Sequence, residues 1–280
     1  MELSVFLMVV ITLAAFFCEY TDSTLGMGYG TTMTPVLLLF GFKPLEIVPV
    51  ILLSELITGF FAAFLHQREG NVLFWVKSLS PKFILIKLRE LGWHESLKRG
   101  ISADLKVVVV LILGSIVGAI SGAFMNKILP KFWVQLYIGV LVMIMGVLIL
   151  TFLKRKFLFS WFKLGFLGLL ASFNKGFTGG GYGPIIASGQ ILSGVSAKNA
   201  VGITSFAEGV TSLFGVIIYA FFIKGVVSWH LAPFIIIGAL LSVPLSVKSV
   251  KIIPTKNLKL LIGILTLILG SVTLFKLFSS

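Results

Sequence analysis

The sequence predicts an all-α polytopic membrane protein made of two inverted repeats. Three observations predict this fold: the chain is apolar along its whole length, runs long enough to cross a bilayer recur, and one glycine-rich motif occurs twice. Hydrophobic residues make up 58% of the 280 positions and charged residues make up 12%, about half the charged share of soluble domains. The mean hydropathy is +1.09, and the sequence lacks the alternating short strands of a membrane barrel.

The long apolar runs give the full membrane spans. A helix needs about 20 apolar residues to cross the hydrocarbon core of a bilayer, and several runs approach or reach that length. They cover residues 45–65, 107–124, 132–153, 201–223, 231–247 and 260–278. Three of these runs fall in each half of the chain, as two copies of one unit would place them.

The repeated unit is marked by a glycine motif followed by a lone acid. Residues 26–30 read Gly-Met-Gly-Tyr-Gly, and Glu55 follows the last glycine by 25 positions. Residues 179–183 read Gly-Gly-Gly-Tyr-Gly, and Glu208 follows the last glycine by the same 25 positions. An offset of 153 therefore superimposes the two motifs, and internal repetition of this kind is typical of secondary transporters.

Past the motifs, the offset between matching residues becomes smaller. Pro130 matches Pro254 at an offset of 124, which is 29 less than 153, so the first half carries an insertion of that length. We therefore expect a first repeat at residues 1–153, with the insertion within 67–106, and a second repeat at 154–280. Basic and large apolar residues are mixed in 67–106, which is typical of an amphipathic segment on the cytoplasmic face of a membrane.

Each repeat opens with two shorter apolar segments that flank its glycine motif. These segments cover residues 3–17, 31–40, 157–173 and 185–192. Short, Gly- or Pro-interrupted segments at matching places predict a pair of broken helices at a binding site. Pro35 and Pro184 strengthen the prediction of a break, because proline removes a helix hydrogen bond. Both a re-entrant pair and a fully spanning pair fit this pattern.

The net charge of +13, from 23 basic and 10 acidic residues, indicates the orientation in the membrane. Basic residues collect in cytoplasmic loops, where they meet anionic lipid, so membrane lipid and not nucleic acid is the expected partner of this charge. With 67–106 inside, an inverted second repeat also places the basic cluster at 248–259 inside, whereas a parallel repeat would place it outside. The positive-inside rule therefore favours the inverted arrangement, in a multi-pass protein of the cell (inner) membrane.

The two glycine clusters form the candidate solute site, because an inverted repeat brings them together near the middle of the bilayer. Backbone N–H groups at glycines and the starts of the following helices favour an anion, and Lys175 adds a positive charge. The candidate substrate-binding residues are Thr24, Gly26, Gly28, Tyr29, Gly30, Asn174, Lys175, Thr178, Gly179, Gly181, Tyr182 and Gly183. Two alternatives stay open: the glycines serve only close helix packing, and Lys175 serves only to pair with an acid such as Glu19 or Asp22.

Four acids are candidates for coupling or gating: Glu19, Asp22, Glu55 and Glu208. Glu208 is the only acid after Asp104, and a carboxylate inside an apolar helix is costly and usually functional. Burial favours the neutral form of a carboxyl group, so Glu55 and Glu208 are suited to carry a proton. The alternative is that both are structural acids held by hydrogen bonds.

The sequence predicts no cofactor, no metal site and no enzymatic chemistry. His66, His94 and His230 are scattered without the spacing of metal ligands, and a single cysteine, Cys18, excludes a thiolate cluster. A nucleotide-binding loop would need a glycine followed by lysine and then serine or threonine, which the chain lacks. We therefore expect a protein that moves a solute and not one that converts it.

The motifs resemble those of the TauE/SafE family, the membrane exporters of sulfite and organosulfur anions. The stronger likeness lies in the second half of the chain, and the first half carries a weaker copy. The matching positions are residues 174–184, Gly189, Gly194, residues 200–204 and Glu208, and then residues 26–30, Pro35, Gly41, Pro44 and Glu55. The resemblance implies a secondary transporter of a small sulfur-containing or carboxylate anion, driven by the proton gradient.

The first half departs from the family pattern in its acidic run at residues 18–22. Two acids beside the site either neutralise Lys175 or favour a cation, so a cation permease or channel-like pore that uses the intramembrane acids is the alternative. A membrane subunit that recruits partners through its basic segment is a third hypothesis. The expected partners of a transporter are a small anionic solute, a proton or other coupling ion, and membrane lipid; homo-oligomerisation stays open.

Overall fold

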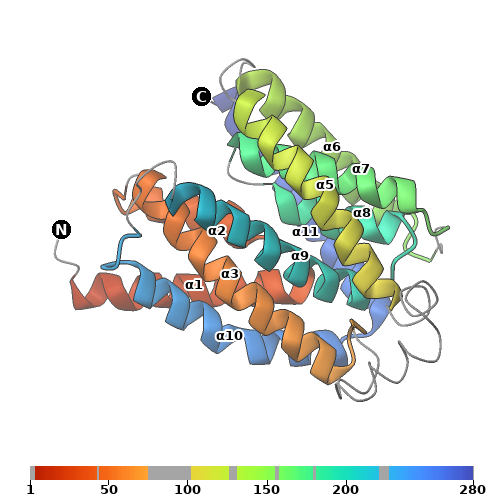
Figure 1. The fold of residues 1–280 in the computed structure, drawn as a ribbon, viewed down its shortest axis with the longest axis horizontal. Helices are drawn as coiled ribbons and strands as arrows, with labels where there is room; N and C mark the ends of the chain where they lie inside the picture. The colour runs from red at the N-terminus through yellow and green to blue at the C-terminus, as the bar shows by residue number, and fades with distance from the viewer. Residues whose placement is uncertain are drawn as a thin grey trace, which may run out of the picture.

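The computed structural model describes residues 4–42, 44–74, 102–125, 131–154, 158–178, 181–220 and 227–279. The regular structure in these ranges is helical, and no strand occurs in them (Figure 1). The helices are α1 (Val5–Leu25), α2 (Tyr29–Leu39), α3 (Pro44–Glu69), α5 (Ala103–Met125), α6 (Lys131–Thr151), α7 (Trp161–Thr178), α8 (Tyr182–Leu192), α9 (Ala197–Ile218), α10 (Ala232–Ile252) and α11 (Thr255–Ser279). The predicted all-α class is confirmed. Residues 75–101, most of the predicted insertion, lie outside the described ranges.

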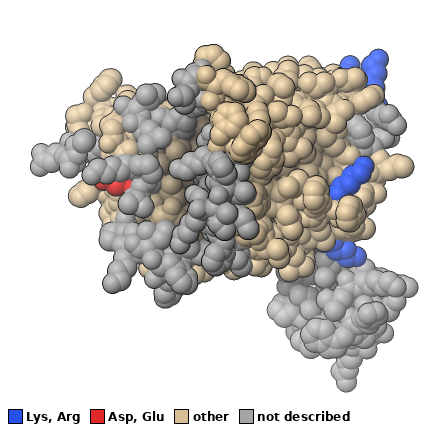
Figure 2. All heavy atoms as spheres, turned by 90° about the horizontal axis from the view of Figure 1, so that it is seen from above, with Lys and Arg blue, Asp and Glu red and all other residues tan. Residues whose placement is uncertain are grey.

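Several helices have the length and composition of membrane spans. In the described part of the chain, α1, α3, α9, α10 and α11 are long and apolar enough to cross a membrane, and α5 and α6 occupy the other two predicted runs. Large apolar side chains such as Phe6, Leu113 and Phe162 are exposed, which suits contact with lipid. On the face seen in Figure 2, uncharged residues cover most of the described surface, and Lys and Arg lie toward its right-hand side. The chain is a polytopic membrane protein.

The helices beside the glycine motifs run further than the apolar segments that predict them. α1 continues through the acidic run to Leu25, and α7 continues to Thr178. A short joint at residues 26–28 connects α1 and α2, and a second joint, which includes Gly181, connects α7 and α8. The acids of the first motif and Lys175 extend from helices and not from irregular backbone, which fixes their positions more firmly.

Pro184 does not cause the break before α8. Pro184 is the third residue of α8, within the first turn, where backbone N–H groups have no helical partner. Its missing N–H therefore costs no helix hydrogen bond, and the prediction that Pro184 adds to the break is wrong. The break comes before it, at Gly181, whose φ of 79° is open to glycine at little cost.

The long helices pack in four pairs: α1 along α10, α5 along α7, α3 along α9, and α6 along α11 (Figure 1). Each pair joins one helix from residues 1–153 with one from residues 154–280. The two halves of the chain are therefore interleaved and do not form two separate bodies. A site between the halves can draw side chains from both.

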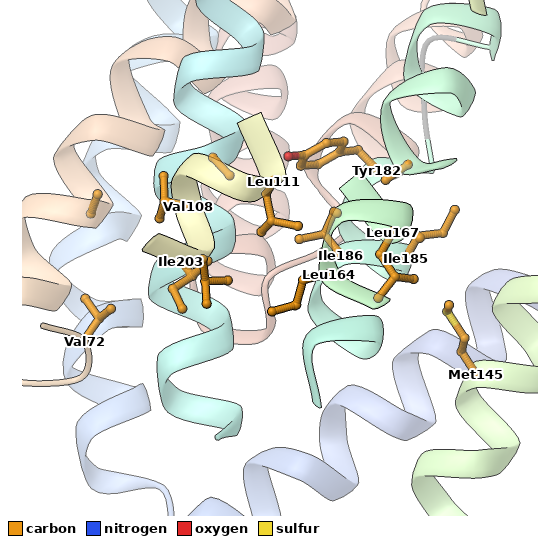
Figure 3. Packing of buried hydrophobic residues seen from close by; sticks show 14 of the residues in the cluster. Val72, Val108, Leu111, Met145, Leu164, Leu167, Tyr182, Ile185, Ile186 and Ile203 are labelled. Carbon is orange, nitrogen blue, oxygen red and sulfur yellow. The ribbon is translucent and has the colours of Figure 1, made fainter. Parts of the chain in front are cut away.

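Two of the buried apolar clusters are formed by the helices that carry the glycine motifs and the acids. One lies between α5, α7, α8 and α9, where Leu111, Leu164, Ile186 and Ile203 are fully buried (Figure 3). The other lies between α1, α2, α3 and α10. Its fully buried members include Ile11, Met33, Ile47 and Ile235. The polar residues described below lie on helices that contribute to one or the other of these clusters.

Glycines bring α3 and α9 into close contact beside the acids. A Cβ added at Gly59 of α3 would lie 2.8 Å from the Cα of Gly209 on α9. Small residues allow membrane helices to approach at backbone distance. Glu55 lies one helical turn before Gly59, and Glu208 directly precedes Gly209, so this crossing holds the two acids on neighbouring helices.

One end of the molecule, here called the basic end, joins the ends of α3 and α10 to the start of α9. Lys251, near the end of α10, places its Nζ 2.8 Å from Glu69 Oε2 at the end of α3. Lys198, near the start of α9, donates to the carbonyl oxygen of Lys251 at 2.6 Å. α3 therefore runs toward the basic end, while α9 runs away from it.

Further contacts add α5, α6 and α11 to the basic end. Asn199 of α9 donates to Asp104 Oδ2 in the first turn of α5 at 2.7 Å. Lys259, near the start of α11, donates to the carbonyl oxygen of Phe152, just after α6, at 3.0 Å. Since α11 follows α10 directly, the basic end gathers the starts of α5, α9 and α11 and the ends of α3, α6 and α10.

Candidate functional site

The two glycine motifs meet in the middle of the structure. A Cβ added at Gly183 would lie 2.8 Å from the Cα of Met27 and 2.9 Å from the carbonyl oxygen of Gly26. Gly26 and Gly28 have φ angles of 75° and 122°, which L side chains rarely adopt. Glycine is therefore needed twice over: for the turn of the first joint, and for the approach of the second joint to it.

The first joint carries its own anion. Asp22, in the last turn of α1, accepts a hydrogen bond through Oδ1 from the backbone N–H of Tyr29 at 3.2 Å. Tyr29 is the first residue of α2, so the Asp22 carboxylate occupies the positive start of that helix. The protein itself therefore supplies a hydrogen-bond acceptor for the backbone N–H at the start of α2.

The second joint differs in charge. The residue before α8 is Gly181, which has no side chain to accept a hydrogen bond from the start of the helix. The nearby charge is the Lys175 ammonium, whose Nζ lies 5.3 Å from the centre of the Tyr182 ring. A helix start and an ammonium group both favour negative charge, so this joint offers a place for an anion that the first joint does not.

Lys175 lies between two buried acids. Its Nζ lies 2.9 Å from Glu55 Oε2 and 3.5 Å from Glu208 Oε1. Ser212 Oγ lies 3.3 Å from the same Nζ and donates to Glu55 Oε2 at 2.9 Å. The ammonium thus bonds tightly to Glu55 and only weakly to Glu208. In the described part of the chain Lys175 pairs with these two acids, and no ion pair joins it to Glu19 or Asp22.

Glu19 is held by hydroxyl groups. Ser23 donates to its Oε1 at 2.6 Å, and Thr58 of α3 donates to its Oε2 at 3.2 Å. The neighbouring Ser54 hydroxyl lies 2.7 Å from the Tyr29 hydroxyl. Thr58 has one hydroxyl hydrogen and also donates to the Ser54 carbonyl oxygen at 2.9 Å, so Ser23 is the stronger donor to Glu19.

Glu208 is the exception among the four acids. The residue is only 7% exposed, and its Oε2 is buried with no hydrogen-bond partner. Buried polar atoms normally find a partner, and an unpaired buried carboxylate oxygen is costly. The Glu208 oxygen therefore marks a place where the site is incomplete.

Two small cavities lie side by side at this centre. The first is lined by Glu19, Asp22, Glu55, Thr58, Gly59, Ser205 and Glu208. The second is lined by Asp22, Gly28, Tyr29, Gly30, Thr31, Glu55, Lys175, Gly181, Tyr182, Gly183, Pro184 and Glu208. Both are narrow, with room for a water-sized group. Three acids, Asp22, Glu55 and Glu208, border both cavities.

Most of the residues predicted for the solute site line these cavities, and a few lie elsewhere. Thr24 is buried near the end of α1, and Gly26 packs against Ala187 and Thr204. Asn174 accepts a hydrogen bond from the Tyr137 hydroxyl of α6. The side chain of Thr178 and all of Gly179 fall outside the described residues.

One residue that contacts Lys175 was not predicted from the sequence. Ser212 bridges Lys175 and Glu55, and it follows Glu208 by four positions on α9. Residues four apart share one face of a helix, so the spacing from Glu208 was the available signal. For metals, the described residues hold no group of three or more His, Cys, Asp or Glu arranged as ligands.

Comparison with known proteins agrees with this fold. The family profile described as "Sulfite exporter TauE/SafE" matches residues 11–81 and 92–273. The chain is also 24% identical over 217 residues to the protein described as "Probable membrane transporter protein YtnM" of Bacillus subtilis (strain 168). That match covers 72% of this chain, and this chain spans 60% of the length of the relative. Because the family profile covers most of its length, the chain belongs to the TauE/SafE family of membrane transporters.

Proposed function

We propose that the protein is a secondary transporter that moves a small anion, of the sulfite or organosulfonate class, together with a proton. The observation that carries the proposal is the buried Lys175 ammonium, which borders a cavity at the uncapped start of α8. Charge-assisted bonds from an ammonium and from helix N–H groups suit an oxyanion. The buried acids beside Lys175 suit a proton, which a carboxylate can take up and release.

The directions of the helices support the inverted arrangement of the two halves. At the basic end α3 ends and α9 begins, α10 ends and α5 begins, and α6 ends and α11 begins. In the predicted repeats, at 1–153 and 154–280, these pairs are equivalent helices. Equivalent helices that run in opposite directions are the mark of inverted repeats. The basic end then faces the cytoplasm, by the positive-inside rule, in a multi-pass protein of the cell (inner) membrane.

The depth of the acids supports a site near the middle of the bilayer. At 1.5 Å rise per residue, Glu208 lies about 16 Å along α9 from its start at the basic end, and Glu55 lies about 21 Å along α3 from Glu69. The hydrocarbon core is about 30 Å thick. Both acids therefore fall well inside the core, at the depth expected of a solute site between broken helices.

The narrowness of the cavities supports alternating access. A many-atom solute does not fit a space with room for a water-sized group, so the helices around the site must move apart to admit it. The substrate-binding residues proposed are those that line the second cavity, and the proposed coupling residues are the four acids that line the two cavities. Sulfite and organosulfonates are proposed as the solute because the family profile bears the description of a sulfite exporter.

Reconstitution tests the proposal. The purified protein is placed in proteoliposomes, and uptake of sulfite and of methanesulfonate is followed with and without an inward proton gradient. We expect uptake that saturates with solute, counterflow from preloaded vesicles, and faster uptake under the gradient. An ohmic, non-saturating flux, or no flux of either anion, contradicts the proposal.

A second candidate is a cation permease. It is favoured by the charge count at the two cavities, where four carboxyl groups stand against one ammonium. The same vesicles distinguish it: saturable uptake of sodium, potassium or a divalent cation, with no counterflow of sulfite or methanesulfonate, would favour the cation permease.

A further inference from the structure

We infer that Glu208 is the proton-binding group of the site and that the transported anion takes its place beside Lys175. In this arrangement the anion binds at the start of α8 only while Glu208 is neutral. The inference rests on the proposed function, which it makes specific: one residue carries the proton, and one proton accompanies each anion.

The hydrogen bonds separate Glu208 from the other three acids. Glu19 accepts from Ser23 at 2.6 Å, Asp22 accepts from the backbone of α2, and Glu55 accepts from both Lys175 and Ser212. Such donors stabilise an ionised carboxylate. Glu208 has one contact, to Lys175 at 3.5 Å, and a second oxygen that is buried with no hydrogen-bond partner. A proton on that oxygen displaces no donor.

The position of Glu208 allows it to exchange a proton and to make way for the anion at Lys175. Glu208 lines both cavities, while Lys175 lines only the second, so Glu208 can exchange a proton through the first cavity while the anion occupies the second. Lys175 keeps its short bond to Glu55 and holds Glu208 only weakly. An anion that enters the second cavity can therefore displace Glu208 from the ammonium, provided that Glu208 does not repel it.

Charge explains why the two events are linked. The charged and titratable groups that share the two cavities with Glu208 are Glu19 and Asp22 on α1, Tyr29 on α2, Glu55 on α3, Lys175 on α7 and Tyr182 on α8. The charged residues of α5, Asp104 and Lys106, lie in its first turn at the basic end. With Glu208 ionised, an anion would join a site where acids already outnumber the one ammonium, and buried like charges repel strongly. A proton on Glu208 removes one of those charges as the anion adds one.

The cycle follows from this exchange. On one side of the membrane Glu208 takes a proton onto Oε2 and the anion binds to Lys175 and the start of α8. After the helices have moved, the anion leaves to the other side, the proton leaves Glu208, and the Glu208 carboxylate returns to Lys175. One proton and one anion cross together, so the movement transfers no net charge when the anion is monovalent.

The first test measures how binding of methanesulfonate depends on pH, because this anion stays ionised over the range used. In the wild type, affinity should fall about tenfold per pH unit once Glu208 loses its proton. Glu208→Gln mimics the neutral acid, so it should bind at all pH values as the wild type does at low pH. It should keep counterflow but lose accumulation driven by a proton gradient. Glu46→Gln, which changes an exposed acid at the start of α3, should behave as the wild type. A Glu208→Gln protein with the pH dependence of the wild type overturns the inference.

Two further measurements do not depend on that variant. Binding of methanesulfonate to the wild type in weak buffer should take up about one proton per anion above the pH at which Glu208 ionises; no proton uptake overturns the inference. Infrared difference spectra recorded between high and low pH need no solute at all. Among the carbonyl bands of protonated carboxyl groups that appear at low pH, one should be present in the wild type and in Glu55→Gln and be missing in Glu208→Gln. A band that is kept in Glu208→Gln and lost in Glu55→Gln overturns the inference.

The failures of the two proposals are distinguishable. If the wild type binds neither methanesulfonate nor sulfite, the proposed anion transport fails, while the infrared band still decides whether Glu208 takes the proton. If the wild type transports the anion with a proton and Glu208→Gln does so as well, the proposed function stands and the role of Glu208 is wrong.

Discussion

The two helix joints share a backbone motif and differ in charge. At the first joint Asp22 accepts a bond from the start of α2, and at the second Lys175 lies near the start of α8. The two residues are 153 positions apart, so they occupy equivalent places in the repeat. The first joint therefore brings its own anion, whereas the second brings a cation and leaves its helix start uncapped. We infer that the first joint has a structural role and that the second joint receives the solute.

The largest expected effect comes from removing the cation of the second joint. Lys175→Ala leaves Glu55 and Glu208 buried without their shared partner, which costs about 3–5 kcal/mol for a buried ion pair broken on one side. We expect no saturable sulfonate uptake and a lower melting temperature in detergent. Lys175→Arg keeps the charge and should recover the melting temperature. If Lys175→Ala transports the anion as the wild type does, the second joint is not the solute site.

Ser212 sharpens the comparison, because its equivalent in the first repeat, 153 positions earlier, is Gly59. Ser212→Ala removes a donor to the Glu55 carboxylate, and hydrogen bonds to charged groups contribute about 1.5–3 kcal/mol. We expect a lower melting temperature and weaker anion binding. Ser246→Ala of α10 is the matched control, since the buried Ser246 hydroxyl bonds to the Val243 carbonyl of its own helix and lines neither cavity. An equal effect of both variants would argue against a role for Ser212 at Lys175.

The equivalent glycines Gly183 and Gly30 should differ in their tolerance of alanine. A Cβ at Gly183 meets backbone atoms of Met27 and Gly26 at 2.8 and 2.9 Å, whereas a Cβ at Gly30 meets the carboxylate end of Glu55 at 3.1 Å. Overpacking against backbone costs about 1–3 kcal/mol, while a flexible side chain can move aside. We therefore expect Gly183→Ala to lower the melting temperature more than Gly30→Ala.

A glycine with space around it provides the control for that pair. A Cβ at Gly165 of α7 meets only ordinary van der Waals contact, at 3.6 Å from Val110. Gly165→Ala should leave the melting temperature unchanged or raise it slightly, because alanine favours the helix. Equal losses at 183 and 30 would mean that the two joints are equally crowded, contrary to the structure.

The smallest effect concerns the cap of the first joint. Asp22→Ala removes the acceptor at the start of α2, which costs about 1 kcal/mol for a lost helix cap. Asp22→Asn keeps an acceptor oxygen and should retain most of the stability. Melting temperatures of the two variants measure this difference. If Asp22→Asn is as unstable as Asp22→Ala, the negative charge and not the hydrogen bond holds the joint.

Much of this arrangement could be predicted because each membrane helix is marked by its own run of apolar residues. The apolar runs gave the helix order, and the glycine motifs gave the two joints with Asp22 and Lys175 beside them. The end of α1 could not be read from hydropathy, because the helix continues through Glu19 and Asp22 once those acids are buried among partners. Burial of that kind depends on neighbouring helices and leaves no local signal.

The partners of Lys175 could not be predicted from the sequence either. They depend on how α7 packs against α5, where glycines such as Gly168 allow a close approach, and on the contact of α3 with α9 at Gly59 and Gly209. The sequence alone left Glu19 and Asp22 as equal partners for the lysine. The close approach of α3 and α9 instead brings Glu55 and Glu208 to it.

Anomalous scattering from a labelled solute gives the most direct test of the claim that the second joint holds the anion. Crystals of the protein soaked with 2-bromoethanesulfonate at low pH should show the sulfonate beside Lys175 and the start of α8, with Glu208 moved away from the ammonium. A sulfonate bound elsewhere, with the Lys175–Glu208 contact unchanged, would contradict the account.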